Sequence, residues 1–413
     1  MTAPPAASPA APAHRDPAVH TVTPAQLHWL EGELRAWRAE GLLDQATTDA
    51  IRRRYVANRR FTLSRIVLTL GASFVGLGLV WLVAANLDQM SPLTRFLLMV
   101  AIWLGLVVAS EVVALRRERD GDVASPVVGA LRLLAAGAFG AVVFQAAQSL
   151  QVPAYEPLLV GVWAAGALLW AYAVRGVAPL VLGVVLLAFW FVWQVVDSGD
   201  SALAISAALT TAGVAAAAIG VGHVVLRRPG FAAPWREIGA VLVLIGLFLA
   251  ALPYAWGGPE AGWPLWVGMG VALVLAGLAL ARGDRLDRLE VGLALVGLAL
   301  TVGLALWRYD TAVLDAADPP AGAWARAVLA VVAYVAVASG YAVLGGMRDT
   351  GRLTWLATAA IVVFTTVQAF AVFAPILSGA ALFLAMGVVL LLTGVLADRG
   401  RRRLVREAKE ALS

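Results

Sequence analysis

The stretch GASFVGLGLVWLVAANLDQMSP, residues 71–92, decides the fold, because a long apolar run ends abruptly at the polar residues Asn86 and Asp88. A helix needs about 20 apolar residues to cross a hydrocarbon core of about 30 Å, since in lipid every backbone amide must bond within its own segment. Similar runs recur almost to the end of the chain. The sequence therefore predicts an all-α, polytopic integral membrane bundle.

The composition supports this fold class. Of 413 residues, 61% are hydrophobic and only 14% are charged, whereas soluble domains carry roughly 25% charged residues. The mean hydropathy is +0.83. The chain has no cysteine, which excludes disulfides, thiolate metal sites and cysteine nucleophiles. Lys409 is its only lysine, and the abundance of Arg, Ala, Val, Leu and Gly indicates a GC-rich bacterial genome.

About 12 apolar spans are predicted from runs of sufficient length. They cover residues 66–85, 96–115, 127–150, 158–174, 177–196, 202–226, 238–255, 263–281, 289–307, 324–344, 353–373 and 376–396.

Loops rich in arginine alternate with loops poor in arginine between these spans. Arginine-rich loops hold Arg116, Arg117 and Arg119, then Arg175, then Arg227, Arg228 and Arg236, then Arg282, Arg285 and Arg288, then Arg348 and Arg352. The intervening loops hold only Arg95, Arg308 and Arg326. Short translocated loops avoid Arg and Lys, so the arginine-rich end of the bundle and both termini are predicted to face the cytoplasm, across the bacterial inner membrane. This topology also explains the basic pI, so nucleic acid is not expected as a partner.

Four regions are predicted along the chain. Residues 1–22 form a disordered Pro/Ala-rich tail, and residues 23–62 form a small cytoplasmic amphipathic helical hairpin. In that hairpin Pro24 is expected in the first helical position, Gly41 at the end of the first helix and Asp44 at the start of the second. Residues 63–397 form the transmembrane domain, and residues 398–413 form a basic cytoplasmic tail.

The amino-terminal half resembles a known family. It holds a soluble head, LRAWRAEGLLDQATTDAIRRRY, then the stretch quoted above, then a glycine-rich span that ends in Gln148. This order is similar to that of the bacterial predicted membrane proteins grouped as domain of unknown function 2157. The matching positions are Trp37, Gly41, Ile51, Tyr55, Asn86 and Asp88. The family often shows a Gln-Ile-Tyr-His-like sequence after its third span, and only Gln148 of QSLQ carries it here. The resemblance implies architecture and origin, but no activity.

Polar residues in or beside the spans are the candidate site residues, because polar groups inside lipid are costly. Asn86 and Asp88 form either a solvated turn or an outer vestibule in which Asp88 contacts a cation. Arg132 either pairs with Glu111 or extends to the headgroups. Gln145, Gln148, Gln194 and Gln368 either line a polar path or hydrogen-bond neighbouring helices. His223 is interpreted as an interfacial histidine rather than a proton relay.

Two functions remain open. The first is a non-catalytic membrane protein that organises, senses or assembles, with the helical hairpin and the basic tail contacting cytoplasmic or membrane protein partners. The second is a secondary transporter or channel for a hydrophobic or weakly polar solute, with the four glutamines as its lining. No pattern for catalysis, a metal or a cofactor is visible, so an enzyme is not predicted. The loops LRRERDGD and ARGDRLDRLE are interpreted as positively charged cytoplasmic anchors.

Overall fold

A computed structural model of the chain describes residues 20–22, 24–57, 91–119, 126–153, 155–199, 201–252, 260–307, 320–348 and 350–373, together with a few isolated helical positions elsewhere. The chain divides into two compact units, Met1–Leu70 and Gly71–Ser413. The predicted spans 66–85 and 376–396 and the basic tail lie outside the continuously described residues.

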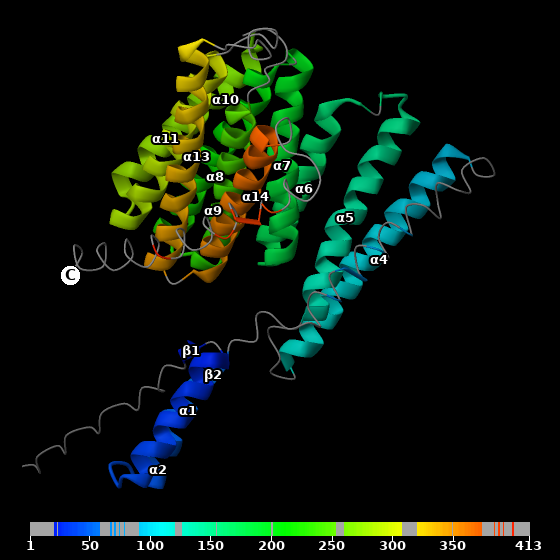
Figure 1. Ribbon diagram of the computed structural model, residues 1–413. Coiled ribbons are helices and arrows are strands. Elements are labelled where there is room, and N and C mark those ends of the chain that lie inside the picture. Colours follow the sequence, from blue (N-terminus) through cyan, green and yellow to red (C-terminus); the bar gives the residue numbers. More distant parts are fainter. Residues whose placement is uncertain are drawn as a thin grey trace, which may run out of the picture. The chain divides into compact units, whose positions relative to one another are not determined.

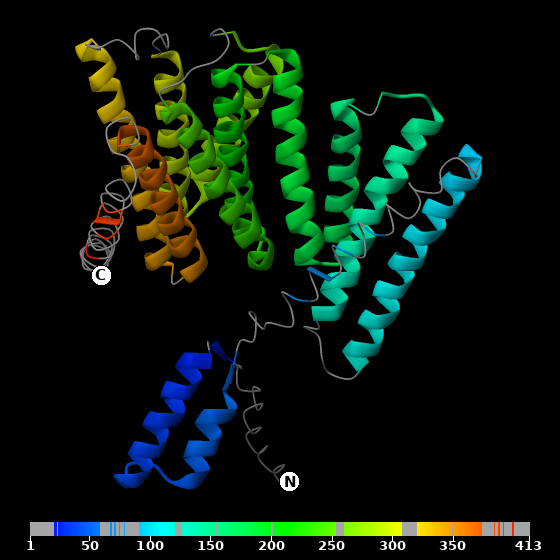
Figure 2. The ribbon, with the colours of Figure 1, turned by 45° about the vertical axis from the view of Figure 1, so that its right-hand side comes forward.

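The continuously described residues of the first unit form two helices and two short strands. Helix α1 covers Pro24–Ala39 and helix α2 covers Gln45–Arg53, and they lie side by side in Figures 1 and 2. The chain leaves α1 through Gly41, whose φ is +75°, and the Asp44 side chain caps α2 by accepting from the Thr47 backbone N–H. An ion pair of 3.1 Å between Glu31 and Arg52 joins the two helices.

The strands were not predicted. β1, His20–Val22, pairs in parallel with β2, Tyr55–Ala57, so the last residues assigned to the tail are part of this unit. Each strand has three residues, too few to show the two-residue alternation that identifies a strand in a sequence.

The second unit is helical, as the composition predicts. Its described helices are α4 (Pro92–Arg119), α5 (Pro126–Ser149), α6 (Pro157–Ala173), α7 (Val177–Ser198), α8 (Ala202–Val225), α9 (Pro229–Ala251), α10 (Trp263–Arg282), α11 (Arg285–Leu306), α13 (Ala321–Met347) and α14 (Gly351–Phe373).

Eight of the described helices are long and apolar enough to cross a membrane, namely α4, α5, α7, α8, α9, α10, α11 and α13. Helix α6 is apolar but shorter. Most described helices begin and end within about four residues of the predicted spans, within the usual uncertainty of such boundaries. The exception is α9, which begins at Pro229 rather than at residue 238 and carries Arg236 and Glu237 inside the helix.

Helix α8 lies at the centre of the second unit and packs against α9, α10 and α11 (Figure 1). Its sequence is rich in Ala, Gly, Ser and Thr, and it is buried along most of its length. At the crossing with α9 the backbones touch. A Cβ added to Gly246 would lie 2.6 Å from the Ser206 carbonyl oxygen, and one added to Gly213 would lie 2.7 Å from the Gly239 carbonyl oxygen. Small residues permit this close approach, which in lipid supplies the packing energy that the hydrophobic effect does not.

Candidate functional site

Two buried carboxylates and two partly buried arginines meet where α9, α11 and α13 come together at the arginine-rich end. We call Arg236, Asp287, Glu290 and Arg348 the charge cluster. Arg236 pairs with Asp287 and lies 3.5 Å from Glu290. Arg348 Nη2 lies 2.9 Å from Asp287 Oδ1 and 3.0 Å from Glu290 Oε2. The Asp287 and Glu290 side chains are only 3% and 1% exposed, so each carboxylate depends on the two guanidinium groups for compensation.

The helices place these charges for identifiable reasons. Asp284 caps α11 by accepting from the Asp287 N–H at 2.7 Å, which puts Asp287 in the first turn, where the helix dipole favours a carboxylate. Arg348 is the C-cap of α13, where the dipole favours a cation. Gly220 of α8 leaves room for the Arg236 stem, because a Cβ there would lie 2.6 Å from Arg236 Cγ.

The sequence did not predict this cluster, because the arginines of the loop ARGDRLDRLE indicate a positively charged anchor at the membrane surface. The acids Asp284, Asp287 and Glu290 recur every third residue and so share one face of a helix, whereas Arg285 and Arg288 lie between them. That spacing was the available signal for an inward acidic face, and Asp287 and Glu290 occupy it.

A buried arginine joins the same three helices at the arginine-poor end. Arg326 of α13 is 6% exposed and was predicted only as a loop residue. Its guanidinium donates to the carbonyls of Ala250 at 3.0 Å, Leu304 at 3.2 Å and Leu252 at 3.3 Å, and to that of Trp307. These carbonyls terminate α9 and α11, so one cation meets the negative dipole ends of both helices.

The structure brings Glu111 and Arg132 together. Arg132 Nε donates to Glu111 Oε1 at 2.8 Å, and Arg132 Nη2 donates to Glu111 Oε2 at 2.9 Å, so the contact between α4 and α5 is bidentate. A fork of this kind fixes both side chains and is among the stronger polar contacts. Glu111 keeps about a third of its side chain exposed, which distinguishes this pair from the charge cluster.

The candidate glutamines are not gathered into one site. Gln145 is buried in α5, Gln148 is exposed at the end of α5, and Gln194 and Gln368 are partly exposed on α7 and α14. No hydrogen bond links any two of them in the part of the chain that the structure describes. The candidate vestibule residues Asn86 and Asp88 lie outside the described residues.

His223 lies in a cluster of aromatic side chains between α6, α8 and α9. Its Nδ1 is 2.8 Å from the Ile219 carbonyl oxygen, which can only accept, so Nδ1 carries the proton. Its Nε2 therefore accepts from the Tyr172 hydroxyl at 2.9 Å, and that hydroxyl accepts in turn from Trp235 Nε1 at 3.2 Å. The Tyr172 and His223 rings are stacked. The histidine therefore connects helices through satisfied hydrogen bonds.

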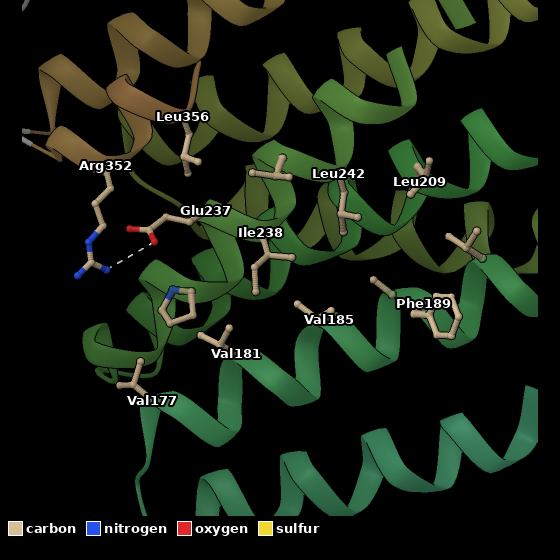
Figure 3. A pocket seen from close by; sticks show the side chains of 14 residues that line it. Val177, Val181, Val185, Phe189, Leu209, Glu237, Ile238, Leu242, Arg352 and Leu356 are labelled. Carbon is tan, nitrogen blue, oxygen red and sulfur yellow. Dashed lines mark ion pairs between the residues drawn. The ribbon is translucent and has the colours of Figure 1, made fainter. Parts of the chain in front are cut away.

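A lateral cleft of about 480 Å³ lies between α7, α9 and α14, with Leu209 of α8 in its wall (Figure 3). Its lining is aliphatic and aromatic except at one end, where Glu237 and Arg352 face each other with 3.7 Å between Oε2 and Nη1. None of the candidate glutamines lines it. Within the described ranges, no group of three or more histidine, aspartate or glutamate side chains is placed to hold a metal ion.

Part of the chain matches a known family of proteins. Residues 35–179 match the model of a family described as "Predicted membrane protein (DUF2157)", which confirms the resemblance over that part of the chain. No curated protein and no solved structure matches the chain. The matched residues include Glu111 and Arg132, whereas the charge cluster, Arg326 and most of the cleft lie beyond them.

Proposed function

We propose that this multi-pass membrane protein, whose residues 35–179 match the DUF2157 family, is a non-catalytic organising or assembly protein of the bacterial inner membrane. In this proposal both termini are cytoplasmic, the second unit is a rigid membrane anchor, and the small first unit contacts protein partners. The distribution of arginines between loops supports the orientation.

The observation that carries the proposal is that α9, α11 and α13 are joined by buried charges at both ends. The charge cluster joins them at the arginine-rich end, and Arg326 joins them at the other. Alternating access requires one group of helices to rock against another around a central site. Separating these three helices at either end would leave buried charges or helix-end carbonyls without partners, which costs several kcal/mol. The arrangement therefore favours a rigid anchor over a moving transporter.

The first unit offers a surface for partners. Trp29 and Leu42 are large apolar side chains exposed on it, and exposed aromatic residues are enriched at protein interfaces. A rigid membrane anchor that presents such a surface suits assembly better than catalysis.

One observation favours the alternative, a secondary transporter or channel. Ionisable residues inside transmembrane helices often mark the path of a solute or a coupled ion, and Asp287 and Glu290 are such residues. In that case the charge cluster would be a gate at the arginine-rich end, and the helices would separate there.

Cysteine accessibility distinguishes the two functions, because the native chain has no cysteine. Ala294 is fully buried midway along α11, and Ala294→Cys is probed in membrane vesicles with an impermeant maleimide added from each side in turn. The controls are Asp197→Cys and Arg285→Cys, which replace exposed residues at opposite ends of the helices.

The anchor proposal expects Ala294→Cys to remain unlabelled from both sides, Asp197→Cys to label only from the periplasmic side and Arg285→Cys only from the cytoplasmic side. Labelling of Ala294→Cys would show that water enters the core between the tied helices, and the transporter would replace the anchor. Controls that label from the reversed sides would refute the proposed orientation.

A further inference from the structure

The lateral cleft has the length of a lipid chain. Val177, Val181, Val185 and Val192 of α7 lie along it, and the 15 steps from Val177 to Val192 at a rise of 1.5 Å each give a length of about 22 Å. One leaflet of the hydrocarbon core is about 15 Å thick. An extended alkyl chain therefore fits along the cleft, whereas a compact solute would occupy only part of it.

The cleft is too small to enclose a whole helix. A helix of the same length with a diameter of about 10 Å would fill roughly 1,700 Å³, whereas the cleft holds about 480 Å³. The occupant must be narrow and apolar along most of its length.

Charge is confined to one end of the cleft, as Figure 3 shows. Arg352 lies there at the beginning of α14, and Glu237 lies there in the early turns of α9. The Arg352 side chain is 47% exposed. Arg175 is exposed two residues before Val177, where the cleft begins. This end of the cleft holds two arginines and one glutamate, so its net charge is positive. It lies at the ends of the helices, where the lipid headgroups are expected.

A guanidinium carries five N–H donors, so Arg352 can hold Glu237 and a phosphate oxygen together. Glu237 then acts as a positioning residue that holds Arg352 at the mouth. Basic pockets between transmembrane helices at the cytoplasmic face bind anionic lipid headgroups by the same chemistry.

We propose that the cleft between α7, α9 and α14 binds an anionic glycerophospholipid, with one acyl chain along α7 and the phosphate on Arg352. The site belongs to the membrane unit and goes beyond the proposed anchor function, because a rigid anchor and a transporter could each carry such a lipid.

Native mass spectrometry of the purified full chain tests the proposal. The protein in detergent is supplied with either dioleoylphosphatidylglycerol or dioleoylphosphatidylcholine, which have the same acyl chains and differ in headgroup charge. We expect retained phosphatidylglycerol adducts to exceed phosphatidylcholine adducts at least fivefold. Equal retention of the two lipids would overturn the assignment of the phosphate to Arg352.

Variants locate the lipid. Val185→Trp fills the middle of the cleft, and its control, Val274→Trp, replaces a valine on the apolar surface of α10 that is also exposed, at 64% against 47% for Val185. We expect Val185→Trp to lower the phosphatidylglycerol adduct at least fivefold and Val274→Trp to leave it unchanged. An equal effect of both, or of neither, would show that the lipid does not occupy this cleft.

The charged end of the cleft is tested with separate variants, so the proposal does not depend on whether Val185→Trp folds. Arg352→Gln should reduce the preference for phosphatidylglycerol to within about twofold of phosphatidylcholine, and Arg352→Lys should retain most of it. Glu237→Gln should retain phosphatidylglycerol, because the arginine is kept. Unchanged preference in Arg352→Gln, or loss of the lipid in Glu237→Gln, would refute the assigned roles.

Discussion

Removal of Arg348 should destabilise the second unit strongly, and a second substitution should reverse much of the loss. In the native charge cluster two arginines compensate two carboxylates. Arg348→Gln leaves Arg236 alone against Asp287 and Glu290, so the cluster acquires an uncompensated negative charge in a position with almost no exposure to water. The rescue is Glu290→Gln in the same chain, which restores neutrality.

The magnitude follows from the distances. Each contact of Arg348 with a carboxylate is about 3 Å long, and two unit charges at that separation attract by about 5.5 kcal/mol at an effective dielectric constant of 20. Desolvation of the ions offsets part of this attraction, and loss of one partner from a buried pair typically costs about 3–5 kcal/mol. We expect Arg348→Gln to lower the free energy of unfolding by that amount. The double variant should regain about 2 kcal/mol or more, because only hydrogen bonds of about 1 kcal/mol each are then lost.

The free energies are measured by titrating the protein in mixed micelles with sodium dodecyl sulfate and following tryptophan fluorescence. Arg285→Gln is the control, since Arg285 lies at the same end of α11 but is exposed, and it should change stability by less than about 0.5 kcal/mol. Two outcomes would refute the reasoning: a loss below about 1 kcal/mol for Arg348→Gln, or a double variant as unstable as the sum of the two single variants.

Other parts of the structure give further predictions. Arg326→Met removes the donor shared by the helix-end carbonyls of α9 and α11 and should cost about 3 kcal/mol in the same titration; a neutral result would mean that water satisfies these carbonyls. Gly246→Ala should cost about 1–3 kcal/mol, because its Cβ would meet the backbone of α8. Gly222→Ala, whose Cβ has open space, should be neutral or stabilising, and equal losses would disprove the close crossing. Arg227 follows α8 with φ of +57°, so Arg227→Gly should raise the unfolding temperature by relieving the left-handed conformation, and an unchanged or lower temperature would contradict this. The hydrogen bond from Thr47 lowers the pKa of the Asp44 carboxyl. The stability that the Asp44 cap gives to α2 is therefore complete above about pH 4 and is lost as the pH falls through the lowered pKa. Circular dichroism should show this acid loss of helix in the native chain but not in Asp44→Ala.

The sequence predicts the helices well because lipid imposes one rule along the whole chain. A run of about 20 apolar residues must form a helix, so α5, α7, α8 and α10 begin and end close to the predicted residues. The rule fails for α9, because Arg236 and Glu237 interrupt the apolar run although partners on α11 and α14 compensate their charges. Hydropathy is a property of single residues, and it cannot show that a distant residue neutralises a charge.

The candidate sites differ in predictability for the same reason. Glu111 and Arg132 could be paired from the sequence because both lie near the same end of consecutive spans. The partners of Asp287 lie 51 and 61 residues away along the chain, so only the packing of α9, α11 and α13 identifies them. The crossing at Gly213 and Gly239 is another relation between helices, which glycine content suggests but does not locate.

The placement of Arg326 and Arg348 on one helix has a consequence for biogenesis. Synthesis delivers α9 and α11 to the membrane before α13, so Asp287 and Glu290 at first face Arg236 alone, and the carbonyls that end α9 and α11 have no arginine donor. Insertion of α13 supplies the missing cation at one side of the membrane and the missing donor at the other in a single event. A nascent chain that stops before residue 321 is therefore left with excess buried negative charge, which is a feature that quality-control proteases of the membrane can distinguish from the finished protein.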